Sequence, residues 1–319
     1  MTNKKIPIVF AFDDNYALPA SIAIRSLFDA KNPDTEYDII VFHDGLQTST
    51  MRKMETICPI RWIKVDNSYL KNAPVTSNWP LAVYYRLLIA NLVTDYDKIV
   101  WSDVDVLFRD DLTNIYNTPL GDADWAGVIA EQRDETNGVH QHFPENKKPF
   151  VHMSGFMVIN AKKWRDKNLL QKFLDIISKY NKQLKMFDLD VLNLACDEIA
   201  SVPFEYCVLQ NIYDMPDISK APEYPWLSRA HSHKELIRAK TNPIIIHYAG
   251  TWPKIWNMPT SQIPQYYMDY IKSSPFYISE HYYPTWRTSI YRAWLWLLIK
   301  ICPVKSWRKK MKSAKKRLK

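Results

Sequence analysis

The chain has 319 residues, 47% of them hydrophobic, so it is long enough to bury a core in one large domain or two smaller ones. With only 6 glycines, 20 prolines and no long biased stretch, the fibrous and disordered classes are excluded. The net charge of +8 comes from one end, because residues 305–319 hold nine Lys or Arg and no acid, which leaves about −1 for residues 1–304.

The first part of the chain alternates strand and helix patterns. A continuous apolar run at 6–12 predicts a buried strand, and residues 16–30 have helical spacing. A strand at 38–42, a helix at 48–57 and a strand at 61–65 follow. This alternation predicts a parallel sheet, in which ligands bind beyond the carboxyl ends of the strands.

The later elements are expected with less regular spacing. They are a helix at 79–92, strands at 98–101 and 153–160, an amphipathic helix at 161–180, a helix at 188–199 and a strand at 243–247. Residues 214–238 are weakly periodic and contain several prolines, which predicts a loop or lid.

Two aspartates spaced one apart, Asp103 and Asp105, follow the strand at 98–101. Carboxylates at the end of a buried strand can reach one hard cation, and their oxygens suit Mg²⁺, Mn²⁺ or Ca²⁺. A third ligand from an imidazole favours Mn²⁺, and His247 at the end of a separate apolar strand is the candidate. The alternative interpretation is a pair of surface aspartates at a turn.

A site with two or three protein ligands keeps positions open for a diphosphate, whose charge a metal offsets as the leaving group departs. Acids also follow the first predicted strand, at Asp13 and Asp14. His140 and His142 are a second candidate for a small metal site, and the alternative is a loop in the acceptor region.

Five segments, in order, carry a family resemblance. They are IVFAFDDNYALPASIAIRSL at 8–27, YYRLLIANLVTDYDKIVWSDVDVLFRDDL at 84–112, MSGFMVINAKKWR at 153–165, DLDVLN at 188–193 and IIHYAG at 245–250. With these segments the chain resembles the retaining glycosyltransferases of family 8 over residues 6–260, and most of all the bacterial lipopolysaccharide and lipooligosaccharide sugar transferases.

The resemblance implies an α/β fold of the GT-A nucleotide-sugar-binding type, with a central, mostly parallel sheet. It also implies a UDP-sugar donor, Mn²⁺ (or Mg²⁺) as cofactor, and a saccharide or lipid-linked glycan as acceptor. The implied residues are Asp103, Asp105 and His247 at the metal; Ala11, Asp13, Asn15 and Tyr16 at the uridine; Val104 between the metal ligands; Arg86 at the sugar and diphosphate; Ser154, Gly155 and Asp188 at the sugar; and Gly250 and Lys254 at the diphosphate.

The chain departs from the family pattern at three places. Met153 and Leu189 stand where polar residues are usual, and the closing motif after Gly250 is one residue longer, with the order of Pro and Lys exchanged at Lys254. Because two of these changes remove polar groups near the expected sugar pocket, the identity of the donor sugar stays open.

Retention of configuration requires either a covalent intermediate or attack from the face that the leaving group departs from. Leu189 cannot be a nucleophile, whereas Asp190 can serve if the helix start turns it inward. We prefer same-face attack, with the donor diphosphate receiving the proton. The expected catalytic residues are Asp188 and Arg86, which the resemblance implies at the sugar and diphosphate, together with Asp190.

The C-terminal region is expected to be a helical, basic extension. Residues 1–270 are the expected catalytic domain, and 271–319 an aromatic and basic membrane-associating region. The apolar stretch at 293–299 is too short to span a membrane. Trp and Leu at helical spacing among dense Lys and Arg predict that residues 293–319 bind an anionic membrane surface, and the alternative is a solubilising tail. Nucleic acid is not an expected partner.

The four cysteines have no regular spacing, which argues against a disulfide framework or zinc site. The N-terminus lacks the apolar core of a signal peptide. The expected location is therefore cytoplasmic, peripheral on the inner face of the cell membrane.

The expected function is a metal-dependent, retaining hexosyltransferase that moves galactose or glucose in cell-surface polysaccharide biosynthesis. One alternative is an inactive relative that binds a nucleotide sugar or a glycan. Another is a self-glucosylating primer of a storage polysaccharide, which needs an acceptor tyrosine that the 19 Tyr do not single out.

Overall fold

A computed structural model describes residues 5–76, 79–132, 143, 148–219, 229–250 and 253–282, together with 294, 296–298, 300 and 307. His140, His142 and most of 293–319 lie outside the described residues. The chain divides into two compact units, Met1–Ala249 and Gly250–Lys319. The domain boundary expected after residue 270 stays a prediction.

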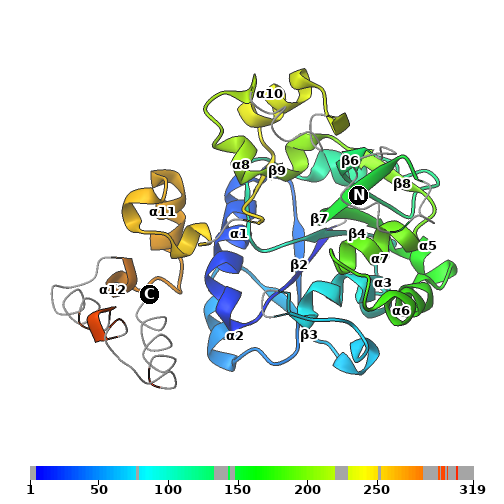
Figure 1. Ribbon diagram of the computed structural model, residues 1–319, viewed down its shortest axis with the longest axis horizontal. Coiled ribbons are helices and arrows are strands. Elements are labelled where there is room, and N and C mark those ends of the chain that lie inside the picture. Colours follow the sequence, from blue (N-terminus) through cyan, green and yellow to red (C-terminus); the bar gives the residue numbers. More distant parts are fainter. Residues whose placement is uncertain are drawn as a thin grey trace. The chain divides into compact units, whose positions relative to one another are not determined.

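Within the described residues, the first unit is built on a sheet of seven strands in the order β3-β2-β1-β4-β7-β6-β8 (Figure 1). The strands are β1 (Ile6–Ala11), β2 (Tyr37–His43), β3 (Ile60–Lys64), β4 (Lys98–Ser102), β6 (Trp125–Gln132), β7 (Phe150–Asn160) and β8 (Ile199–Val202). All neighbouring pairs are parallel except those of β7, which runs opposite to β4 and β6. The predicted mostly parallel α/β sheet is confirmed.

The helices of this unit follow the strands as the sequence alternation predicts. They are α1 (Ala17–Ala30), α2 (Thr48–Glu55), α3 (Ile89–Leu92), α4 (Thr113–Asn117), α5 (Ala161–Asp166), α6 (Leu169–Tyr180), α7 (Asp188–Ala195), α8 (Gln210–Tyr213) and α10 (His233–Thr241), with 3₁₀ turns η1 (Asp14–Tyr16), η2 (Asn67–Leu70), η3 (Leu81–Leu88) and η4 (Phe204–Cys207). In Figure 1, α3, α5, α6 and α7 gather in one group, apart from α1 and α2.

Several expected elements differ from those observed. The helix expected at 161–180 is two helices, because Asn168 lies in the left-handed region at φ 49° and ends the first one. The helix expected at 79–92 begins as the 3₁₀ turn η3 and becomes α-helical only in α3.

Other boundaries also move. The helix expected at 188–199 stops at Ala195, and Ile199 already belongs to β8. The strand β7 is longer than predicted and starts at Phe150. The lid expected at 214–238 contains the start of α10, which a capping box between Ser232 and Glu235 begins.

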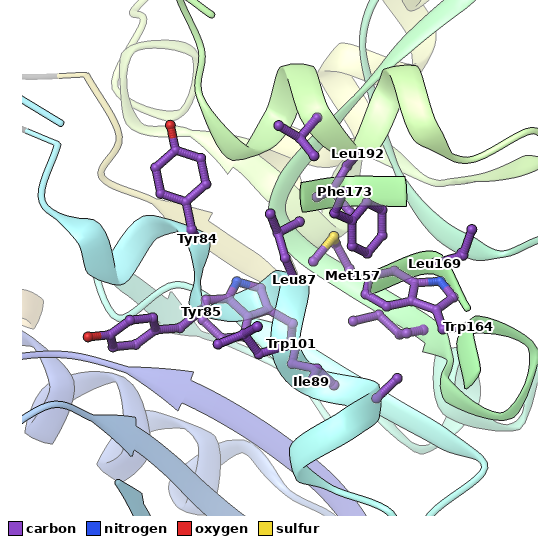
Figure 2. Packing of buried hydrophobic residues seen from close by; sticks show 14 of the residues in the cluster. Tyr84, Tyr85, Leu87, Ile89, Trp101, Met157, Trp164, Leu169, Phe173 and Leu192 are labelled. Carbon is purple, nitrogen blue, oxygen red and sulfur yellow. The ribbon is translucent and has the colours of Figure 1, made fainter. Parts of the chain in front are cut away.

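A group of buried side chains from several elements fills the space between the sheet and the helices, as Figure 2 shows. Trp101 from β4 and Met157 from β7 lie beside Leu87 of η3, and Trp164 packs edge-on against Phe173, with ring centroids 5.1 Å apart. Burial of large apolar side chains on this scale is the main stabilising contribution to such a fold. It also packs α7 against β7 and against η3.

A second, smaller sheet completes the first unit. It consists of β5 (Val106–Phe108), β10 (Ile245–His247) and β9 (Val208–Leu209), in the order β5-β10-β9. The strand β10 is antiparallel to β5, with His247 opposite Val106. This register brings the end of β10 to the turn that joins β4 to β5.

The second unit begins at Gly250. Its elements are η6 (Ile255–Asn257), η7 (Thr260–Gln262), α11 (Gln265–Ser273) and α12 (Ser279–Tyr282). The Tyr282 hydroxyl donates a hydrogen bond to the Trp256 carbonyl at 2.8 Å. Among the described residues of the whole chain, no helix combines the length and the apolar character that a membrane crossing needs.

Candidate metal centre and donor site

Three side chains that can bind a metal meet where β4 and β10 end and β5 begins. One ligand atom from each of Asp103, Asp105 and His247 lies within 4.8 Å of the others. His247 Nε2 is 3.2 Å from Asp105 Oδ1 and 3.6 Å from Asp103 Oδ2. The backbone helps to align them, since the Asp103 amide donates to the Gly155 carbonyl and the Tyr248 amide to the Asp105 carbonyl, each at 2.8 Å.

The cluster fits a divalent metal. Two carboxylates and one imidazole form a donor set that accepts Mn²⁺ and also suits other divalent ions. Gly155 leaves room for the ring, because a Cβ there would lie 2.4 Å from His247 Cε1 and 2.9 Å from Nδ1. Any side chain at 155 would therefore push the imidazole away from the two acids. Asp103, Asp105 and His247 are the residues that would hold the ion, and Mn²⁺ itself stays a prediction.

The environment of the imidazole favours positive charge. Burial acts to lower the pKa of His247, but the Cys207 sulfur and the Asp105 carboxylate raise it well above its ordinary value. Cys207 Sγ lies 3.3 Å from His247 Nδ1, on the opposite side of the ring from the acids. Cys207 was not singled out from the sequence, because its partner is 40 positions away.

Arg86 joins the candidate metal ligands to a third acid, Asp188. Its Nη2 lies 2.8 Å from Asp103 Oδ1, and its Nε lies 3.1 Å from Asp188 Oδ2. Nη1 donates to the Ser154 carbonyl, and the guanidinium carbon lies 4.7 Å from the centre of the Trp101 ring. The side chain is only 6% exposed, so this cation is held among its partners in a fixed orientation.

Asp188 is a buried acid whose carboxylate takes part in the same network. It accepts a hydrogen bond from the Ser154 hydroxyl at 2.8 Å. Burial raises the pKa of Asp188 to about 6, against the opposing effects of Arg86 and the Ser154 hydroxyl. The sequence places Asp188 at the start of a helix, and the fold turns it toward Arg86.

Asp190 does not join this network through its Oδ2 atom. That oxygen accepts hydrogen bonds from the backbone N–H groups of Lys185 and Met186, each at 2.8 Å. The side chain is buried. Its expected catalytic role stays a prediction.

The residues after β1 lie at the same sheet edge as the cluster, because β1 and β4 are parallel neighbours. Asp13 is exposed and caps η1, accepting from the Asn15 and Tyr16 amides on Oδ1 and from Asn15 Nδ2 on Oδ2. Burial and the charges of Asp105, Asp13 and Asp103 raise the pKa of Tyr16 to about 12.

The remaining predicted residues divide between the two units. Ala11 ends β1 and is half-buried, and Val104 is buried between the two aspartates. Gly250, at φ 72°, and Lys254 belong to the second unit, where Lys254 Nζ lies 5.8 Å from the Trp256 ring. Their contact with a diphosphate stays a prediction.

The chain is similar to a known protein family. The chain matches the model of Glycosyl transferase family 8 over residues 7–259. It is 25% identical over 288 residues to general stress protein A of Bacillus subtilis (strain 168), across 83% of this chain and 93% of that protein. It is 26% identical over 195 residues to lipopolysaccharide 1,2-glucosyltransferase of Escherichia coli, across 59% of this chain and 57% of that protein.

Among solved structures, the chain is similar to the galactosyltransferase LgtC in complex with donor and acceptor sugar analogs. The TM-score is 0.68 at 24% sequence identity, and the match covers 84% of this chain and 96% of that one. At this level of identity the likeness shows the fold, which is the GT-A type of α/β fold.

Proposed function

The chain belongs to glycosyl transferase family 8, and on that premise we propose that it transfers a hexose from a UDP-sugar to a glycan or lipid-linked saccharide, with retention of configuration. Galactose and glucose are the two donor sugars that we consider. The setting is the biosynthesis of a cell-surface polysaccharide of the lipopolysaccharide type, as the similarity to the lipopolysaccharide 1,2-glucosyltransferase of Escherichia coli suggests.

One observation carries the proposal: Arg86 connects the acids that follow β4 with a buried acid at the start of α7. On one side is the Asp103, Asp105 and His247 cluster, which suits a divalent ion and a diphosphate. On the other side is Asp188, whose carboxylate can accept hydrogen bonds from sugar hydroxyls. A donor of the UDP-sugar type has a diphosphate and a polyol next to each other, which matches this arrangement.

A divalent ion held by the three ligands would offset the negative charge that develops on the departing diphosphate. Arg86 keeps Asp103 and Asp188 in a fixed relative position, which orients the donor. In same-face attack, the bond between the sugar C1 and the diphosphate oxygen breaks, and a bond from the acceptor oxygen to C1 forms. The acceptor proton then passes to the diphosphate oxygen.

The proposal also includes a location at the membrane. Trp294, Trp296, Leu297 and Trp307 are exposed among the described residues of the C-terminal region, and Lys300 Nζ lies 3.9 Å from the Trp296 ring. Exposed Trp next to Lys is typical of segments that bind at the interface of an anionic bilayer. We therefore propose that the protein is peripheral on the cytoplasmic face of the cell membrane.

A donor panel tests the proposed function. The wild-type chain is incubated with Mn²⁺ or Mg²⁺ and each of several UDP-sugars, and UDP release is measured with and without saccharide acceptors. We expect release with UDP-galactose or UDP-glucose that EDTA abolishes and that Asp103→Ala lowers by at least about 100-fold. A matched control is Asp122→Ala, an exposed acid away from the cluster.

Two other results would redirect the assignment. If UDP-sugars bind without any turnover, the chain is the inactive, ligand-binding relative. If the intact mass of the protein increases by one hexose without an acceptor, it is a self-glucosylating primer.

A further inference from the structure

The turn that precedes α7 contains a backbone conformation that L-amino acids rarely adopt. Phe187 has φ 49° and ψ −111°, and it is directly followed by Asp188. A large side chain at such φ and ψ values is an outlier that persists only where the surrounding structure holds it. The contacts around Phe187 therefore have to supply that restraint.

Two sets of contacts hold the turn. Asp190 Oδ2 accepts hydrogen bonds from the backbone N–H groups of Lys185 and Met186, each at 2.8 Å, which ties the turn to the first turn of α7. The Phe187 ring packs against Trp79 at 5.5 Å and edge-on against Tyr84 at 6.3 Å. The side chains of both Phe187 and Asp190 are buried.

The restrained turn sets the direction of Asp188. With Phe187 in this conformation, Asp188 Oδ2 accepts from the Ser154 hydroxyl at 2.8 Å and lies 3.1 Å from Arg86 Nε. If Phe187 moved to an ordinary helical or extended conformation, the chain would leave the turn in another direction. Asp188 would then lose one or both of these partners.

We infer that Asp190 is a positioning residue rather than a nucleophile: its carboxylate holds the strained turn at Phe187 and thereby aims Asp188 at Arg86 and Ser154. The inference rests on the proposed function and assigns it the same-face route. In the covalent route a carboxylate oxygen of Asp190 would form a bond to the sugar C1. An attack by Oδ2 would take that oxygen from two backbone N–H groups that it accepts from in this structure.

The decisive comparison is between Asp190→Asn and Asp190→Ala in the full-length chain. An amide oxygen can still accept from the Lys185 and Met186 amides, so D190N is expected to keep kcat within about 10-fold of wild type. D190A removes the acceptor. Its kcat is expected to be lower than that of D190N by about 10-fold or more, because Asp188 is then misplaced. Asp188→Asn provides the calibration, because the site uses that carboxylate directly.

A nucleophile gives the opposite pattern. Neither Asn nor Ala can form the glycosyl–enzyme bond, so D190N and D190A would be equally inactive, with losses on the order of 10⁴-fold or more and with UDP binding intact. Equal losses of that size would overturn the inference. A covalent adduct on Asp190, found by mass spectrometry of peptides from the trapped enzyme, would do the same.

A second measurement does not depend on turnover, so it stands even if the proposed function fails. Glycine adopts positive φ without the clash of a Cβ, and we therefore expect Phe187→Gly to unfold at a higher urea concentration than Phe187→Ala. In the D190A background this difference should shrink, since the turn is free to relax. Two results would contradict the inference that Asp190 holds the turn at Phe187. One is an F187A variant that is more stable than F187G, and the other is a stability difference between F187G and F187A that D190A leaves unchanged.

Discussion

At the scale of single residues, the imidazole of the candidate metal site has a partner outside the three candidate ligands. His247 faces two acids with Nε2 and contacts Cys207 with Nδ1. The partner of the second imidazole nitrogen fixes the orientation of a metal-binding ring, and loss of such a partner typically costs 10- to 100-fold in affinity. A thiol is a weak partner, but it can either donate or accept.

The corresponding prediction concerns Mn²⁺ affinity. We expect Cys207→Ala to weaken Mn²⁺ binding by about 10-fold, because Nδ1 loses its buried partner, whereas Cys207→Ser retains wild-type affinity within about 3-fold. Isothermal titration calorimetry or Mn²⁺ electron paramagnetic resonance measures this without turnover. Cys58→Ala is the matched control, since Cys58 is also a buried free cysteine. If C207S and C207A bind Mn²⁺ equally weakly, the contact between Cys207 and His247 contributes packing only and does not orient the ring.

At the scale of elements, α10 supports the strand that carries His247. The helix ends shortly before β10, and its Arg238 pairs with Glu205 of η4, the turn that also contains Cys207. The Ile244 amide donates to the Glu205 carbonyl at 2.8 Å. The helix α10 thus packs with η4, which carries Cys207, and leads into β10, which carries His247.

The capping box at the start of α10 gives the second prediction. Replacing Ser232 by Ala removes the acceptor of the Glu235 amide and should lower the free energy of unfolding by about 1 kcal/mol at pH 7. Hydrogen bonds from Ser232 lower the pKa of Glu235 below its ordinary value of 4.5. Glu235 therefore binds a proton less readily in the folded state than in the unfolded state. The stabilisation that its carboxylate contributes is present above pH 4.5 and is lost as pH falls through the lowered pKa.

Urea unfolding of wild type and S232A at pH 7 and at about pH 3 measures both effects, and the difference between the two proteins should shrink at the lower pH. Ser232→Asp is the control, because Asp is also a good N-cap residue and should keep most of the stability. A difference that grows at low pH would contradict the role assigned to Glu235.

At the scale of the whole molecule, the charge is divided unevenly along the chain. Residues 305–319 hold nine basic residues, while the rest of the chain is close to neutral. Attraction to an anionic bilayer contributes about 1 kcal/mol for each basic residue near the surface. On the proposed membrane surface, the exposed Trp294, Trp296 and Trp307 would add apolar contacts at the depth of the lipid headgroups.

The third prediction is a membrane-binding measurement. In co-sedimentation, the full-length chain should bind vesicles that contain about 30% phosphatidylglycerol at least about 10-fold more strongly than pure phosphatidylcholine vesicles, and raised salt should weaken the binding. Replacing Trp296 and Trp307 by Ser should reduce binding without removing its salt dependence. Neutralising the Lys and Arg of 305–319 to Gln should remove the preference for anionic lipid. Equal binding to both vesicle types would reject the proposal.

Much of the fold could be predicted because its signals are local. The buried run at 6–12 and the alternation after it correctly predicted the strands and helices of the parallel half of the sheet. The break at Asn168 escaped prediction, because the apolar periodicity of 161–180 continues across this residue and does not indicate its positive φ of 49°. The prediction that the helix at 188–199 extends to Ile199 was wrong, because the pairing of Ile199 with β6 in the sheet outweighed the helical periodicity.

The sequence by itself determined the chemistry that is available: two acids after a strand, an imidazole after another strand, and a basic, aromatic end. The tertiary structure decided which of these groups meet. His247 reaches Asp105, 142 positions away, because β10 pairs with β5 in one register, and Arg86 links Asp103 to Asp188 through η3 and α7. Residue types and short spacings are properties of the local chain, whereas strand register and helix packing depend on contacts between segments that are distant in the sequence.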